Sequence, residues 1–188
     1  MAKVTLTSVR LSFPHLFTPQ ASSDGQGEPK YNATFIVEPG SANAKALAKA
    51  VEAVAKEKWG EKSAGVLAAL RKGDKVCYRE EEKTNQSGDV YAGFEDSHWL
   101  SASSKVRPTV IDRDKSPLTS ADGKPYGGCY VNVIIDVWPQ DNAYGKRINA
   151  DLKGVQFVKD GDAFSGGGAA SVDDFDVVDA PEGAEDLA

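Results

Sequence analysis

The sequence has few of the residues that build metal centres, disulfide frameworks and nucleophilic active sites. Among 188 residues there are two cysteines, Cys77 and Cys129, and two histidines, His15 and His98. These four residues lack the spacing of a zinc site, and no G-x-S-x-G motif is present. Without a secretion signal, both thiols are expected to be reduced rather than paired. The sequence therefore predicts a protein that is not an enzyme and that binds no metal or other cofactor.

Long hydrophobic runs are also missing. No stretch of 18 apolar residues occurs, and the first residues, MAKVTLTSVRLSF, lack the apolar segment of a signal peptide. We therefore expect no membrane partner and a cytoplasmic location. Hydrophobic residues make up 40% of the chain, which is enough for one core, so a single folded domain is predicted over residues 1–159.

Positive charge is absent from the end of the chain. Residues 160–188 contain nine Asp or Glu and no Lys or Arg, whereas residues 1–159 hold all 22 basic residues and the other 19 acidic ones. A mildly basic body thus precedes a strongly acidic segment, joined by the linker SGGGAAS. Such a composition cannot bury a core, so residues 160–188 are predicted to form a disordered tail.

The body is dominated by the alternation of apolar and polar residues that is typical of strands. In the first strand this alternation changes phase near Thr7 and Ser8, which predicts a bulge or a sharp bend, and Pro14 and Pro19 are expected to end the strand. Helical spacing replaces alternation over residues 42–58, after a possible N-cap at Ser41, and again over 63–70. Strands are predicted over residues 3–13, 30–38, 75–79, 98–104, 106–111, 128–138 and 146–158.

This order of elements predicts a β-dominated α+β fold. Five or more strands of uneven length, with helices inserted after the second strand, favour a small five-stranded barrel, closed or half-closed. An open sheet is the alternative. The strand with the clearest alternation contains Val131, Val133, Ile135 and Val137, and we expect it to be central.

Basic and aromatic residues are repeatedly neighbours in the body. Single-stranded nucleic acid is held by cations that follow the phosphates and by aromatic rings on which the bases stack. We expect Phe35 and Trp138 to be core residues instead. The candidates for binding are Lys30, Tyr31, Arg79, Tyr91, Trp99, Lys105, Arg107, Tyr126, Tyr144, Lys146 and Arg147.

The acidic tail suggests a competitor for such a surface. Tethered by a flexible linker, its negative charge would compete with nucleic acid for the same cations, and once released it would be free to bind other proteins. The motif Asp173-Asp174-Phe175-Asp176 is the predicted partner-binding segment, with replication or recombination proteins as possible partners.

Several long blocks of the sequence resemble a bacteriophage single-stranded DNA-binding protein family. They are VRLSFPHLFTP, PKYNATFIV, SASSKVRPTVIDRDKSPL, YGGCYVNVIIDVWPQDN and GKRINADLKGVQFVKDGDAFSGG, in order over residues 4–168. The resemblance implies an OB-fold barrel with an acidic, disordered C-terminal tail. It also implies a role in protecting single strands during phage replication, recombination and repair, in the host cytoplasm.

The resemblance adds Tyr130 to the candidates and supports Lys105, Arg107, Tyr126 and the segment 144–147. One departure concerns the end of the tail. Many single-strand binders end in a terminal Phe, whereas this chain ends in Leu187-Ala188, and its nearest equivalent, Phe175, is internal.

Two other functions fit parts of the sequence. A protein–protein adaptor would use the barrel as a scaffold, since Tyr and Arg are also enriched at protein interfaces. A metal-dependent nuclease would use Asp112 and Asp114, which alternate in VIDRDKSP and would share one face of a strand.

Overall fold

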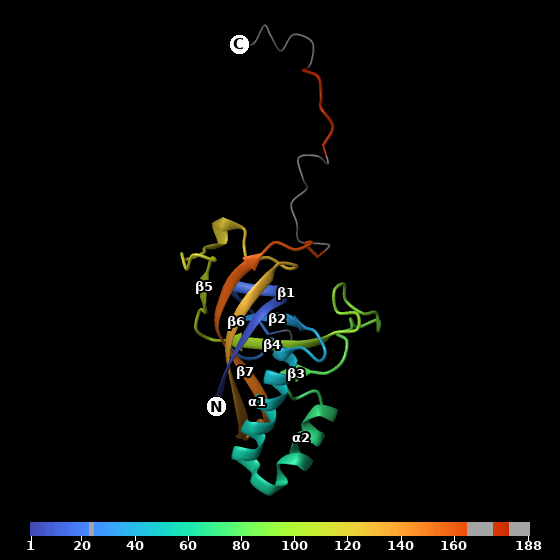
Figure 1. Ribbon diagram of the computed structural model, residues 1–188, viewed down its shortest axis with the longest axis vertical. Coiled ribbons are helices and arrows are strands. Elements are labelled where there is room, and N and C mark those ends of the chain that lie inside the picture. The colour runs from blue at the N-terminus through green and yellow to red at the C-terminus, as the bar shows by residue number, and fades with distance from the viewer. Residues whose placement is uncertain (23–24, 165–174, 181–188) are drawn as a thin grey trace.

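A computed structural model describes residues 1–22, 25–164 and 175–180 (Figure 1). Within these residues the strands form one sheet, in the order β3-β4-β2-β1-β6-β7-β5, and β4 also pairs with β7. Because this last pairing joins the two sides of the sheet, β1, β2, β4, β7 and β6 close into a barrel. The strands are β1 (Ala2–Gln20), β2 (Lys30–Val37), β3 (Tyr78–Arg79), β4 (His98–Ser104), β5 (Thr109–Ile111), β6 (Tyr130–Asn142) and β7 (Gly145–Lys159).

The predicted fold class is confirmed. The protein is an OB-fold-like five-stranded barrel with two additional strands, β3 and β5, and a helical insertion after the second strand. The barrel closes at a single parallel pair, Ser103 with Asp151, while all other barrel pairs are antiparallel.

Strand β1 is long and bent, and it pairs with two neighbouring strands. Its first half pairs with β6 and its second half with β2. The predicted bulge is present, because the register with β6 shifts between Leu6 and Val9, and Ser8 between them has a φ of 52°. The expected end at Pro14 was wrong, since β1 continues to Gln20. Both prolines fall within register shifts against β2, where a missing N–H interrupts no regular ladder.

The helical insertion consists of α1 (Ala42–Trp59), a 3-10 turn (Gly60–Lys62) and α2 (Ser63–Lys72), and it lies at the lower end of the barrel in Figure 1. Helix α1 begins as predicted, because the Ser41 side chain accepts a hydrogen bond from the Ala44 amide at 3.2 Å. The apolar stripe of α1, which includes Leu47, Val51 and Val54, is buried, and the helix contacts β1 and β6.

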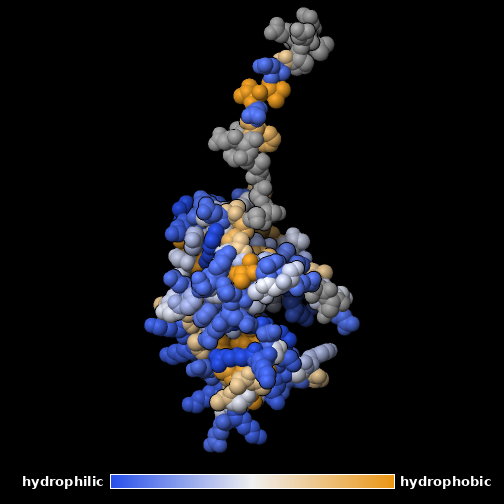
Figure 2. Space-filling model, turned by 90° about the vertical axis from the view of Figure 1, so that its right-hand side faces the viewer, coloured by the Kyte–Doolittle hydropathy of each residue, from blue (hydrophilic) through white to orange (hydrophobic). Residues whose placement is uncertain are grey.

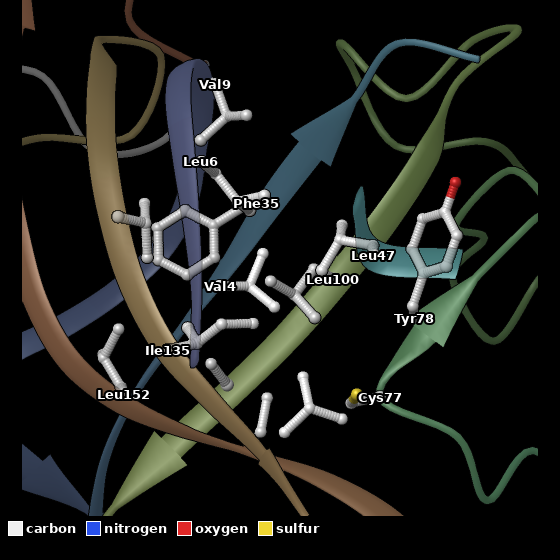
Figure 3. Packing of buried hydrophobic residues seen from close by; sticks show 14 of the residues in the cluster. Val4, Leu6, Val9, Phe35, Leu47, Cys77, Tyr78, Leu100, Ile135 and Leu152 are labelled. Atoms are coloured by element: carbon white, nitrogen blue, oxygen red, sulfur yellow. The ribbon is translucent and has the colours of Figure 1, made fainter. Parts of the chain in front are cut away.

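The core fills the barrel and continues under α1. Figure 3 shows Leu6, Phe35, Leu100, Ile135 and Leu152 converging from five different strands. The same cluster includes Leu47 of α1 and the free thiol of Cys77 (Figure 3). Burial raises the pKa of Cys77 to about 12, so this thiol stays protonated and unreactive at neutral pH.

Substitution of two adjacent isoleucines of β6 is expected to separate the two faces of the strand. Ile135 is fully buried, whereas Ile134 is 36% exposed. Ile135→Ala should lower the free energy of unfolding by about 2–5 kcal/mol, because it leaves a cavity in the barrel. Ile134→Ala is the matched control and should cost about 1 kcal/mol or less. Urea denaturation of both variants measures the difference, and equal losses would contradict the assigned register.

The five residues after β7 lie against the barrel, although the sequence analysis placed them in the tail. The Phe164 amide donates to the Gly127 carbonyl at 3.1 Å, and Arg10 Nη2 donates to the Asp162 carbonyl at 2.7 Å.

In the described parts of the chain, no helix is long and apolar enough to cross a membrane.

Candidate nucleic-acid interface

A groove of about 1000 Å³ lies where the barrel closes. It is lined by residues of β4, of β7 with the β6–β7 hairpin, and of the segment 76–83, where Cys77 hydrogen-bonds to both Ile148 and Ser101. We call it the β4–β7 groove. Its lining side chains come from segments far apart in sequence, which meet where β4 pairs with β7 at Ser103 and Asp151.

The β4–β7 groove is strongly basic. Among the described residues, six cationic side chains line it against a single carboxylate, that of Asp151. The cations are Lys30, Arg79, Lys83, Lys105, Arg147 and Lys153. Although the whole chain has a net charge of −6, the field inside this groove therefore favours an anionic ligand.

Three aromatic side chains, Trp99, Trp138 and Tyr144, lie in the same groove. Tyr144 stands at the hairpin tip and is 90% exposed. The indole N–H of Trp138 donates to Asp151 Oδ1 at 2.9 Å, which fixes the orientation of a partly exposed ring. The groove therefore combines flat apolar faces with cations.

Trp99 lies close to two of the cations. Its ring centroid lies 4.1 Å from Lys83 Nζ and 5.0 Å from the guanidinium carbon of Arg79. Trp99 is only 9% exposed and packs with Ile36 and Phe94, so it belongs to a small core cluster as well as to the groove. Little of this ring is therefore open to a base.

The two cations beside Trp99 differ in their partners. Arg79 is paired with Asp74 at 3.0 Å and also donates to the Val76 carbonyl. Lys83 forms no ion pair with any described residue. Burial, and to a lesser extent the charge of Arg79, lower the pKa of Lys83. An anion placed here would gain most from Lys83, whose charge has no compensating carboxylate.

One edge of the groove carries an exposed ion pair. Lys105 Nζ lies 2.9 Å from Glu28 Oε2, and the hydrogen bond from Lys105 lowers the pKa of Glu28. Glu28 is thus paired with a lysine that an anionic ligand would also contact.

Figure 2 shows one side of the molecule, where hydrophilic residues dominate the body and hydrophobic ones form separate patches.

The structure brings six of the twelve predicted binding residues into the β4–β7 groove. They are Lys30, Arg79, Trp99, Lys105, Tyr144 and Arg147. Because they come from β2, β3, β4, the loop after β4 and the β6–β7 hairpin, only the closed barrel places them together.

The other six predicted residues do not line the groove. Tyr31 pairs with Ser104 on the flank of β4, and Lys146 is exposed near the hairpin tip. Tyr91 packs edge-on against Phe13, with ring centroids 5.0 Å apart. Of the remaining three, Arg107 contacts Phe17, Tyr126 contacts Asp160 and Tyr130 contacts Lys159.

Sequence reasoning missed three of the groove's most distinctive residues, Lys83, Trp138 and Lys153. The prediction that Trp138 is a core residue was wrong, since it is partly exposed and lines the groove. A signal was available for two of them. Trp138 shares the polar face of its strand with Asn132 and Asp136, and Lys153 alternates with buried residues of β7.

Asp112 and Asp114, the candidates for a nuclease, lie in a turn beside β5. Asp112 is paired with Lys124 at 2.8 Å, and Asp114 accepts hydrogen bonds from Ser116. The hydrogen bonds from these partners lower the pKa of both carboxyl groups. Across residues 1–22, 25–164 and 175–180, no group of three or more His, Cys, Asp or Glu side chains is arranged to hold a metal ion.

The predicted partner-binding motif is only partly within the described residues. Asp173 and Asp174 lie outside them. Phe175 is 71% exposed, and Asp176 beside it is exposed as well.

Comparison with known proteins gives consistent matches. The chain is 43% identical over 189 residues to protein p50 of Acyrthosiphon pisum secondary endosymbiont phage 1, covering 99% of both chains. The single-stranded DNA-binding protein from bacteriophage Enc34, solved in complex with ssDNA, is 29% identical with a TM-score of 0.71, covering 87% of this chain and 89% of that one.

A more distant likeness extends to the fold alone. Gp2.5, a single-stranded DNA-binding protein encoded by bacteriophage T7, has a TM-score of 0.56 at 10% identity, over 91% of this chain and 99% of that one. The family described as the ssDNA-binding protein of Enterobacter phage Enc34 matches residues 2–187. Since this match covers almost the entire chain, the protein belongs to the Enc34 phage ssDNA-binding protein family.

Proposed function

We propose that this protein binds single-stranded DNA along the β4–β7 groove without reading its sequence, and that it protects exposed strands during phage replication, recombination and repair. One observation carries the proposal: six cations, opposed by a single carboxylate, share a groove with three aromatic rings. Family membership and the relative solved with ssDNA support it.

The cations act on the backbone of the strand. Phosphates replace the small counterions around the groove, and the release of those counterions favours binding. Lys83, Arg147 and Lys153 line the groove at different points, so a strand that follows it meets one positive charge after another. Phosphate contacts are the same for every nucleotide, so they carry no sequence information.

The rings act on the bases. Trp138 offers a face held in place by its hydrogen bond to Asp151, and Tyr144 offers a freely accessible ring at the hairpin tip. Stacking tolerates every base because each has a π-face. Asp151 is accordingly a positioning residue: it orients the Trp138 ring, although its charge opposes that of the phosphates.

A titration of labelled oligonucleotides tests the proposal. Fluorescence anisotropy should show saturable binding of oligo-dT, with an affinity within about tenfold of that for a mixed-sequence strand, because stacking and phosphate contacts discriminate weakly. Absence of binding to either strand at low salt would refute the proposal and favour a protein–protein adaptor. Cleavage of the strand in Mg²⁺ would instead favour a nuclease.

The acidic tail is proposed to compete with DNA for the groove and to recruit partner proteins when released. Seven of the nine acidic residues of the segment 160–188 lie beyond Phe164. Through the linker they would be present near the groove at an effective concentration in the millimolar range. The segment 173–176, with Phe175 among its acidic neighbours, supplies the aromatic and acidic chemistry for binding replication or recombination proteins.

Neutralising these seven acids by Asp→Asn and Glu→Gln in the full-length chain is therefore expected to tighten DNA binding about three- to tenfold at low salt. The gain should shrink as salt screens the competition. The control is a chain with the same residues beyond Phe164 in shuffled order, which should behave like the wild type. Equal affinity of neutralised and wild-type chains at low salt would show that the tail does not compete.

A further inference from the structure

Residues 160–164, here called the strap, are fixed across one end of the barrel by contacts at four of their five positions. The Tyr126 hydroxyl donates to Asp160 Oδ1 at 2.7 Å, and the Gly161 amide lies 3.2 Å from the same hydroxyl. Arg10 holds the Asp162 carbonyl, and the Phe164 amide bonds to Gly127. The strap is thus attached to β1 and to the segment just before β6.

The strap lies so close to the barrel that it requires glycine on both sides. A Cβ atom at Gly128, whose φ is +111°, would lie 2.1 Å from the Asp162 carbonyl oxygen. A Cβ atom at Gly161 would lie 2.1 Å from the Gly128 carbonyl oxygen. Backbone therefore packs directly on backbone, an approach that only glycine permits.

The strap ends in a ring that packs on the loop between β3 and β4. The guanidinium carbon of Arg10 lies 4.3 Å from the centroid of the Phe164 ring. Phe164 packs against the buried cluster of Ile36, Phe94 and Trp99. Its fit is tight, because a Cβ atom at Gly93 would lie 2.5 Å from Phe164 Cε1.

The same cluster supports one side of the β4–β7 groove. Trp99 lines the groove and lies under Lys83, and the Tyr91 amide donates to the Lys83 carbonyl at 3.0 Å. A bridge between Thr84 and Val90 closes the loop that follows Lys83. The position of Lys83 therefore depends on how firmly residues 84–97 pack on the barrel.

We infer that Phe164 is a positioning residue of the β4–β7 groove. Its ring holds the loop 84–97 against the barrel, so that Lys83 and Trp99 face the bound DNA. The inference rests on the proposed function and assigns the first residues after β7 to the binding body rather than to the competing tail. Loss of the ring opens the loop for part of the time, and apparent affinity falls in proportion to the fraction that remains competent.

The test uses full-length protein and three single variants. Phe164→Ala should weaken oligo-dT binding about tenfold, while Phe164→Leu, which keeps an apolar side chain, should recover most of the loss. Ile134→Ala is the control, because it truncates a 36% exposed apolar side chain outside the groove and the tail and should leave the affinity unchanged. Amide hydrogen exchange over residues 84–97 should be faster in Phe164→Ala than in the other chains.

A double-mutant cycle shows whether Phe164 acts through the loop. In a Lys83→Ala background, Phe164→Ala should cause much less additional loss than in the wild type, since the cation that it positions is already gone. Additive losses would place the effect of Phe164 elsewhere and overturn the inference.

The failure of this inference can be told apart from failure of the proposed function. If wild-type protein binds oligo-dT, and Phe164→Ala keeps both that affinity and slow exchange over residues 84–97, the positioning role of Phe164 is refuted alone. If the wild type does not bind, the proposed function fails and the groove-positioning role fails with it, even where exchange in Phe164→Ala is accelerated.

Discussion

Raising the salt concentration from about 50 to about 200 mM is expected to weaken binding of oligo-dT about a hundredfold. Six cationic side chains line the groove, and Arg79 is already paired with Asp74, so at most five of them are counted as phosphate contacts. For single strands, the logarithm of the binding constant falls by roughly 0.7 per phosphate contact for each tenfold rise in salt, so five contacts predict a slope of about −3.5.

The same salt slope shows which individual cations contact phosphates. Lys153→Ala removes one groove charge and should reduce the magnitude of the slope by about 0.7. Lys45→Ala removes an exposed lysine from helix α1, outside the groove, and serves as the matched control with an unchanged slope. Anisotropy titrations at four salt concentrations measure all three chains. A wild-type slope near zero would mean that the groove does not neutralise phosphates.

Trp138→Ala is expected to weaken binding by about 1–3 kcal/mol, the usual contribution of one base stacked on an aromatic ring. The salt slope should not change, because no charge is removed. Trp138 is partly exposed and lies outside the buried core, so the fold should survive its loss. Loss of affinity at constant slope is the signature of a stacking platform.

Trp59→Ala provides a closely matched control. Each indole N–H donates to an aspartate at 2.9 Å, Trp59 to Asp141 and Trp138 to Asp151, but only Trp138 lines the groove. Trp59→Ala should therefore leave the affinity nearly unchanged. Equal losses for the two variants would attribute the effect to a general disturbance of the barrel and remove Trp138 from the binding surface.

Local patterns in the sequence predicted most of the fold. The alternation around Val133 and Ile135, the phase change near Ser8 and the N-cap at Ser41 each depend on neighbouring residues, and all three are confirmed. The course of β1 beyond Pro14 was not predictable in this way. It depends on which neighbours β1 has, and in the part of the chain that the structure describes β1 pairs after Arg10 with β2 alone.

The candidate site was harder to predict because it depends on closure of the barrel. Lys30 and Arg147 were recognised from adjacent aromatic residues, yet nothing near Lys83 in sequence shows that it lies over Trp99. The prediction that the chain is not an enzyme agrees with its family, which is one of DNA-binding proteins.

Closure of the barrel through β4 and β7 has a consequence for how the protein is made. Strand β7 is the last strand among the described residues, and it supplies Arg147, Lys153 and other residues that line the groove. A polypeptide emerging from the ribosome therefore has no complete groove until almost all of the body has been synthesised. The nascent chain is accordingly expected to bind nucleic acid weakly. It gains its full affinity only when β7 pairs with β4.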